Sequence, residues 1–387
     1  AQPFICHFTN FLIQPTGMRN YIICFVIVCC SCRTTPITDE GPVKVYIREN
    51  KVYEIKAEDL FSKIRYIGLD YIESHPIGNI KKTYLHNDTL FISDGRTIFQ
   101  YDLNGHYLQS LNRRGRGPEE YYNIMDFTVD DKYLYIVDQN KKILLYTTNN
   151  EFVQTSRLDF FPASLWPFGE YEFLLTSAYQ DDVDKFHIYD NRTLQRVSSF
   201  CPINKAEMNY RHIINQKNFY MIGDRLLFHE PMNNTVYAID STMEISPVYE
   251  FSLCGKNPPS AFWTQKFTSI MDINNQITKE KYCIGIPIYA ESPENILLTY
   301  RDADKYLMCI YSKENETATQ FESIRFSELM PPISIGDLSW NSYGKTNFTV
   351  AIPCTSIFDE NDSIYDPALA PVLKNNGNPV IGIIELK

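Results

Sequence analysis

The residues best suited to chemistry gather in one short stretch, which reads Arg-Arg-Gly-Arg-Gly-Pro-Glu-Glu-Tyr from Arg113 to Tyr121. Guanidinium groups bind carboxylates and phosphates through paired hydrogen bonds, so three arginines on one loop could hold an anionic group. The same charges could instead pair with one another in water, and the glycines, proline and tyrosine suit a structural crossing between strands. The candidate ligand-binding residues of this stretch are Arg113, Arg114, Arg116, Glu119, Glu120 and Tyr121.

Two tryptophans extend the list of candidate ligand contacts. Trp166 and Trp263 lie outside the predicted strands, beside Pro167 and Phe262, and aromatic rings on loops can stack on sugars or other ligand faces. The alternative, which we favour for them and for Trp340, is packing between structural elements.

Familiar catalytic and metal-binding patterns do not appear. There is no Gly-x-Ser-x-Gly nucleophile elbow, no glycine-rich phosphate loop before a helix and no closely spaced histidine pair. Asp181-Asp182-x-Asp184 and Asp302-x-Asp304 resemble calcium loops but lack the glycine and distal glutamate of an EF-hand, so we interpret both as turns. We therefore assign no catalytic residue, predict no metal or cofactor, and lean away from an enzyme.

A recurring pair of predicted strands, which we call the two-strand phrase, must position these residues. Thr89–Asp94 and Ile98–Leu108 form one copy, and Tyr133–Asp138 with Ile143–Tyr146 form the next, with Asp94 and Asp138 about 44 residues apart. A hairpin cannot cover both of its faces, so copies at this period must pack on one another, as in a β-propeller. Five phrases are recognisable, and the strand at Ile64–Leu69 is expected to close a sixth, shared by both ends of the chain. We predict an all-β, six-bladed propeller of four-stranded antiparallel blades, with a pair of β-sandwiches as the alternative.

Composition supports a folded strand-rich protein. The 387 residues include 27 Tyr and 24 Phe, which favour strands and supply a sizeable core. The net charge of −11 argues against a nucleic-acid partner, which requires a cationic surface. We expect a monomer.

The N-terminal region predicts export. Met18-Arg19-Asn20 precedes an apolar run to Cys30 and then Ser31-Cys32, which is typical of a signal peptide too short to span a bilayer. Cys32 resembles the lipidated cysteine of a bacterial lipobox, Cys30 is an alternative, and an unlipidated secretory signal also remains open. The predicted boundaries are residues 1–17 for a segment upstream of the native protein, 18–32 for the signal peptide, 33–43 for a tether and 44–387 for the propeller.

Five cysteines remain in the predicted mature domain: Cys201, Cys254, Cys283, Cys309 and Cys354. Their wide, irregular spacing favours buried thiols that act as small apolar residues. The alternative is that two of them form one disulfide in an oxidising compartment.

The crossing string carries a family resemblance. Gly-x-Gly-Pro-x-Glu-Tyr, between Tyr-Asp-Leu-Asn-Gly and Asp-Phe-Thr-Val-Asp, resembles the six-bladed β-propeller lipoproteins of Bacteroides-type bacteria and, more distantly, NHL-repeat propellers. The resemblance covers about Val45 to Lys387 and is strongest from Ile64 to Val153. It implies a propeller fold and lipid anchoring in the envelope, and it implies little about chemistry.

Two functions follow as hypotheses. The first is a lipid-anchored module in the periplasm or on the outer-membrane surface that binds a glycan, a peptide or an envelope protein; a role in nutrient uptake is a variant of it. The alternative is a glycan- or lactone-directed hydrolase or lyase, with carboxylates and histidines converging on the central channel.

Overall fold

A computed structural model describes residues 41–181, 183–204, 208, 219–222, 225–343, 347–353, 356–357, 366–370 and 377–387. The expectations for residues 1–40, including the signal peptide, Cys30, Cys32 and most of the tether, lie outside this part of the chain, as does Cys354. Within the described ranges, no helix combines the length and apolar character needed to cross a membrane.

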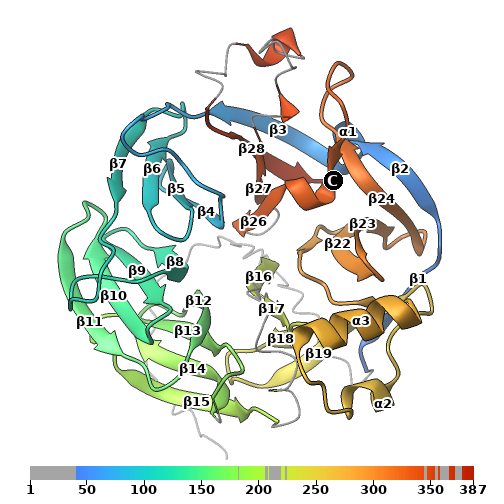
Figure 1. The fold of residues 1–387 in the computed structure, drawn as a ribbon, viewed down its shortest axis with the longest axis horizontal. Coiled ribbons are helices and arrows are strands. Elements are labelled where there is room, and N and C mark those ends of the chain that lie inside the picture. Colours follow the sequence, from blue (N-terminus) through green and yellow to red (C-terminus); the bar gives the residue numbers. More distant parts are fainter. Residues whose placement is uncertain are drawn as a thin grey trace, which may run out of the picture. The chain divides into compact units, whose positions relative to one another are not determined.

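The described strands form six hydrogen-bonded sheets that succeed one another around a common centre (Figure 1). The first three sheets along the chain each consist of four antiparallel strands in sequence order. The first contains β4 (Lys82–His86), β5 (Thr89–Ser93), β6 (Ile98–Asp102) and β7 (Tyr107–Leu111). The second contains β8 (Ile124–Val129), β9 (Tyr133–Asp138), β10 (Lys142–Thr147) and β11 (Phe152–Arg157). The third contains β12 (Pro162–Phe168), β13 (Glu172–Ser177), β14 (Asp184–Asp190) and β15 (Arg196–Pro202).

The next two sheets keep this antiparallel plan and are extended by strands from the start of the described chain. One contains β16 (Phe219–Ile222), β17 (Arg225–His229), β18 (Thr235–Ile239) and β19 (Ile245–Leu253), with β1 (Val43–Ile47) parallel to β19. The other contains β20 (Cys283–Ile284), β21 (Tyr289–Glu291), β22 (Asn295–Asp302), β23 (Lys305–Ser312), β24 (Thr317–Arg325) and β25 (Ile333–Ser334), with β2 (Lys51–Lys56) parallel to β24. Consecutive strands β1 and β2 thus tie two neighbouring sheets together, an arrangement that the sequence did not predict.

The last sheet joins the two ends of the domain. It contains β26 (Ser339–Tyr343), β27 (Asn347–Ile352) and β28 (Val380–Leu386), and β3 (Phe61–Gly68) pairs antiparallel with β28. The prediction that the strand near Ile64–Leu69 closes the last sheet is therefore confirmed. So is the prediction of an all-β propeller with four-stranded antiparallel blades, and the alternative of paired β-sandwiches is wrong.

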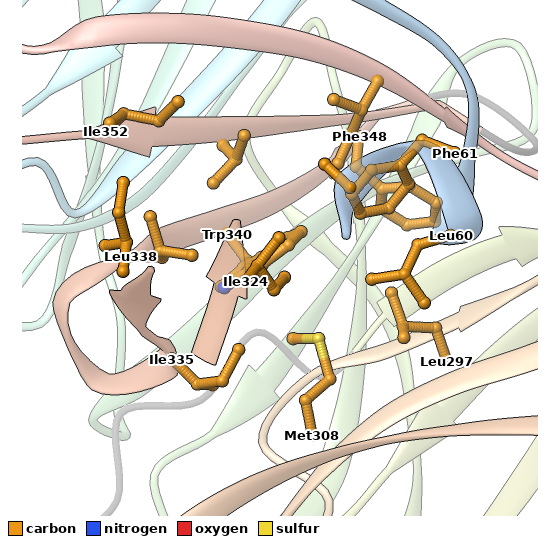
Figure 2. Close-up of a cluster of buried hydrophobic side chains, with 14 of the residues drawn as sticks. Leu60, Phe61, Leu297, Met308, Ile324, Ile335, Leu338, Trp340, Phe348 and Ile352 are labelled. Carbon is orange, nitrogen blue, oxygen red and sulfur yellow. The ribbon is translucent and has the colours of Figure 1, made fainter. Parts of the chain in front are cut away.

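The core lies between the sheets because both faces of each sheet are apolar. Within the described residues, six hydrophobic clusters each combine side chains from two successive sheets. Figure 2 shows the cluster that joins the last two sheets, where Trp340 and Phe348 lie near Leu297, Met308 and Ile324. Every sheet thereby buries the faces that a lone hairpin would leave in water.

Aspartates at strand ends explain why the sequence phrase recurs. Asp138 is the last residue of β9 and accepts hydrogen bonds from the backbone amides of Tyr122 and Asn123, at 2.8 and 3.0 Å. Asp181 follows β13 and accepts one from Phe161 at 2.7 Å. In each case the carboxylate holds the segment that enters the first strand of its own sheet, which supports the interpretation of Asp181 as a turn residue.

Helices are few and short in the described chain. α1 (Ala57–Leu60) precedes β3, and α2 (Ser260–Trp263) and α3 (Ile270–Glu280) lie between β19 and β20. Ser269 caps α3 by accepting a hydrogen bond from the Asp272 amide. Ile273 and Ile277 of α3 pack with Phe262, Met232 and Ile284 in a small separate core. This helical insertion was not predicted.

Candidate functional site

The Arg113–Tyr121 stretch lies in the crossing between the outer strand of one sheet, β7, and the first strand of the next, β8. We call residues 112–123 the crossing loop. In Figure 1, β8 lies toward the centre of the ring and β11 at its periphery. The loop therefore joins the outer strand of one sheet to the inner strand of the next, which agrees with the predicted crossing between strands.

Tyr121 anchors the crossing loop. Its side chain is fully buried among Phe91, Ile98 and Phe127. The carbonyl oxygens of Leu111 and Arg96 lie 2.9 and 3.0 Å from its hydroxyl oxygen, and they share the hydroxyl proton. The hydroxyl oxygen also accepts a hydrogen bond from the Arg113 amide at 3.2 Å. One side chain thus fixes both the start of the loop and the turn between β5 and β6.

Strand β10 holds the other side of the loop. Tyr146 donates its hydroxyl proton to the Glu119 carbonyl at 2.6 Å, and the Lys142 ammonium donates to the carbonyls of Gly117, at 3.1 Å, and Glu120. These contacts lie over the third strand of the sheet, so the acidic part of the loop is not centred on the inner strand β8.

The two glycines of the loop make room for a neighbouring side chain rather than supplying a left-handed turn. Neither adopts the left-handed backbone that favours glycine. A Cβ atom on Gly115 would instead lie 1.9 Å from Glu120 Oε2, and one on Gly117 would lie 3.1 Å from it. Because that oxygen accepts a hydrogen bond from the Gly117 amide at 2.8 Å, the glycines make room for an ordered carboxylate inside the loop.

The basic face of the loop is exposed. Arg113, Arg114 and Arg116 all face solvent. Arg113 forms an ion pair with Glu119 at 3.0 Å, with the two side chains 41% and 53% exposed. Arg114 donates from Nε to the Tyr122 carbonyl at 3.3 Å. An exposed ion pair contributes little stability, so an incoming anion can compete with Glu119 for Arg113 at small cost.

These side chains surround a hollow. Residues of the crossing loop line a cavity of about 620 Å³, which we call the crossing-loop hollow; they are Asn112, Arg113, Arg114, Gly117, Pro118, Glu119 and Glu120. Its size falls within the range of small-ligand sites. The structure thus brings together four of the predicted site residues around one hollow, with Tyr121 beneath them as its support.

The tryptophans do not join this site. Trp166 belongs to β12, where its ring lies 6.3 Å from that of Phe219 and packs on the cluster between the third sheet and its neighbour. Trp263 ends α2, with its ring 4.8 Å from Phe262 in the small helical core. Trp340 is buried beside Phe61. All three therefore make the packing contacts that we favoured, each in a different part of the fold.

The described histidines lie in separate places. His187 stacks on Phe160 at 3.8 Å, and His229 stacks on Tyr220 at 5.6 Å. Burial lowers the pKa of His187 to about 4 and that of His229 to about 3, so both rings are neutral at pH 7. His86 and His106 lie on the surface beside Asp131 and Asp102. Among the described residues, no group of three or more His, Cys, Asp or Glu side chains is arranged to hold a metal ion.

Sequence reasoning missed two buried carboxylates. Glu291 is 2% exposed and accepts hydrogen bonds from Tyr289 at 2.7 Å, Tyr249 at 2.8 Å and Lys313 at 2.5 Å. Glu230 lies 2.5 Å from the Lys185 ammonium and accepts from Tyr179 at 3.0 Å. Each glutamate is followed by turn residues, Ser292-Pro293 and Pro231, and nothing in the local pattern distinguishes them from exposed turn acids.

Comparisons with known proteins agree with this fold. A crystal structure of a Bacteroides fragilis protein, named as a predicted exported protein, matches with a TM-score of 0.69 at 16% identity, covering 90% of this chain and all of that one. A DUF4221 family member from Bacteroides vulgatus matches with a TM-score of 0.47 at 10% identity, covering 85% of this chain and 97% of that one. The Neurospora crassa Pan2 WD40 domain matches with a TM-score of 0.42 at 12% identity, covering 75% and 79%.

The fragilis structure supports the fold alone at this level of identity, and the two more distant ones add nothing to it. No curated protein matches the sequence. The family described as a domain of unknown function, DUF4934, matches residues 42–385, which is nearly the whole described propeller, and the chain belongs to that family.

Proposed function

We propose that this protein is an exported binding module, a six-bladed propeller whose ligand site is the crossing-loop hollow. It acts as a monomer, without a cofactor, in the periplasm or on the outer-membrane surface, anchored by lipid at Cys32. The six sheets, with one hydrophobic cluster between each successive pair, support the count of six blades. The Bacteroides fragilis neighbour, named as exported, supports the location.

The observation that carries the proposal is a hollow whose backbone is held by hydrogen bonds and whose rim carries exposed charges. Tyr121, Tyr146 and Lys142 fix the backbone, whereas the guanidinium groups of Arg113 and Arg114 reach solvent. A preformed backbone reduces the entropy lost on binding, and exposed arginines can turn toward an anionic group. The described histidines and buried glutamates are engaged elsewhere in packing and ion pairs, so no observation favours the hydrolase or lyase alternative.

The ligand class follows from charge. The chain carries a net charge of −11, which repels anions in general. An anionic ligand that binds nevertheless must use a local cationic site, and the crossing loop carries three exposed arginines, of which Arg113 and Arg114 line the hollow and Arg116 does not. We therefore propose an acidic glycan or an acidic peptide segment of an envelope protein.

Thermal shift measurements test this proposal on the full chain. Hexagalacturonate and a glutamate-rich octapeptide serve as anionic probes, and maltohexaose serves as a neutral probe of similar size. We expect at least one anionic probe to raise the Tm by about 3 °C at a concentration near 100 times its Kd, because it binds only the folded state. The neutral hexasaccharide should leave the Tm unchanged.

A charge-matched variant pair locates the site. The Arg113→Ala/Arg114→Ala double variant should lose the shift. Arg48→Ala/Arg157→Ala removes the same charge from two exposed positions outside the crossing loop and should keep it. Equal shifts in both double variants, or in the neutral probe, would refute the assignment of the site.

The lipid anchor has its own test. Radiolabelled palmitate should label the protein in cells, and replacing Cys32 should remove the label. Labelling that persists when Cys30 and Cys32 are both replaced, or no labelling of the native protein, would overturn the anchor without affecting the binding proposal.

A further inference from the structure

Two cysteines from distant parts of the chain meet beside the helical insertion. Cys254 directly follows β19, and Cys283 begins β20, so the two enclose the segment that carries α2 and α3. Their sulfur atoms contact two residues of the same strand, β22: Cys254 contacts Tyr300, and Cys283 contacts Asp302. A backbone hydrogen bond holds the two chain segments together, because the Cys283 amide donates to the Lys256 carbonyl at 2.9 Å.

Polar groups surround this thiol pair. The Cys254 sulfur lies 3.6 Å from the Tyr300 hydroxyl, and the Cys283 thiol donates to Asp302 Oδ1 at 3.4 Å. The other oxygen of Asp302 lies 2.5 Å from the Lys51 ammonium of β2. Cys283 and Cys309 are both fully buried in the apolar cluster between the fourth and fifth sheets, and Cys283 differs from Cys309 by its contact with the Asp302 carboxylate. The pair therefore differs from a thiol that only fills space.

We propose that Cys254 and Cys283 are a redox-modification site, which forms a disulfide that links the two ends of the helical insertion. Because both sulfurs lie against the Tyr300–Asp302 segment of β22, the two thiols can approach one another to the disulfide bond length of about 2.05 Å. Cys254 is partly exposed and can meet an oxidant, whereas Cys283 is buried behind it. This proposal is independent of ligand binding at the crossing loop.

The environment assigns a role to each sulfur. The neighbouring Cys283 thiol and the Tyr300 hydroxyl lower the pKa of Cys254 to about 6. The neighbouring Cys254 and burial raise the pKa of Cys283. Cys254 is thus the thiolate at neutral pH and the first nucleophile.

The oxidant is a small-molecule or protein disulfide. The Cys254 thiolate attacks one of its sulfurs, which forms a mixed disulfide and releases the first thiolate. Cys283 then transfers its proton to the adjacent Asp302 carboxylate or to solvent, and its thiolate attacks the Cys254 sulfur and releases the second thiolate. Two protein thiols are oxidised to one disulfide, and the oxidant is reduced to two thiols.

The test uses the full chain, first reduced and then treated with oxidised glutathione. After the remaining thiols are blocked with N-ethylmaleimide, peptide mass mapping should recover a fragment in which Cys254 and Cys283 are linked. The linkage closes a loop of about 30 residues, and we expect the Tm to rise by about 4 °C over the reduced protein. Dithiothreitol should reverse both results.

Single serine variants provide the controls. Cys254→Ser and Cys283→Ser should each lose the linked fragment and the Tm rise, while their Tm in the reduced state shows whether they fold. Cys309→Ser, the matched control, should keep both. Alkylation of Cys254 and Cys283 after oxidation of the native protein, a fragment linking either of them to another cysteine, or a linked protein with an unchanged Tm would overturn the proposal.

Discussion

Removing one oxygen atom from Tyr121 tests whether the crossing loop is built as described. In Tyr121→Phe the ring keeps its place in the apolar cluster, but the carbonyls of Leu111 and Arg96 lose their shared donor and the Arg113 amide loses its acceptor. Leaving buried polar groups without a partner costs about 1–3 kcal/mol, and the position is fully buried. We expect the free energy of unfolding to fall by about 2 kcal/mol, or the Tm by about 3 °C.

Urea unfolding followed by tryptophan fluorescence measures this loss. Tyr122→Phe is the matched control, because the neighbouring ring is 43% exposed and an exposed substitution should change the free energy of unfolding by no more than about 0.5 kcal/mol. If the two variants are equally stable, the Tyr121 hydroxyl does not anchor the loop, and the support beneath the crossing-loop hollow has been misidentified.

Three further predictions concern other parts of the fold. Glu291→Gln should lower the free energy of unfolding by about 2 kcal/mol, because the partly buried Lys313 would lose its charged partner and two tyrosines would lose a charged acceptor; urea unfolding that matches the exposed control Glu314→Gln would contradict this. His187 and His229 bind protons in the unfolded state below pH 6.5 but in the folded state only near pH 4 and pH 3, so stability should fall as the pH drops through this window, by about 3 kcal/mol for His187 and about 5 kcal/mol for His229. His187→Phe should flatten that dependence, and an unchanged pH slope would count against a buried neutral ring. Gly115→Ala should displace the Glu120 carboxylate and lower the Tm, whereas a wild-type Tm would show that the carboxylate moves aside at no cost.

The sequence predicted those parts of the fold that rest on local chemistry. Asp138 marks the end of a second strand because its carboxylate caps the amides of the entering segment, and that role recurs with the repeat. The closing strand β3 was predicted because the repeat required a partner for the last sheet. Where the same local hydrogen bonding recurs in successive sheets, the repeated sequence pattern predicts the structure.

Features that depend on distant pairing could not be predicted. Strands β1 and β2 pair parallel with β19 and β24, about 200 and 270 residues away, and nothing in their own residues names those partners. Helix α3 interrupts the strand phrase with a capped, amphipathic segment that belongs to no repeat. Glu291 is buried by tyrosines from two sheets, which only the closed ring brings together.

The candidate site shows the same division. The charged string and its tyrosine anchor were recognisable as a unit, because their contacts fall within the crossing loop and the two sheets that it connects. The two tryptophans were grouped with it only by residue type, and the fold separates them. The thiol pair was invisible in the sequence, since the spacing of Cys254 and Cys283 resembles no known motif and only the insertion between them brings them together.

Hydrogen exchange along the crossing loop tests the central claim most directly. The amides of residues 112–123 are monitored by mass spectrometry with and without each anionic probe, hexagalacturonate and the glutamate-rich octapeptide. Our account predicts that at least one probe slows exchange in this segment and that the Arg113→Ala/Arg114→Ala variant loses the effect. Protection confined to other segments, or no protection by either probe at concentrations that shift the Tm, would contradict it.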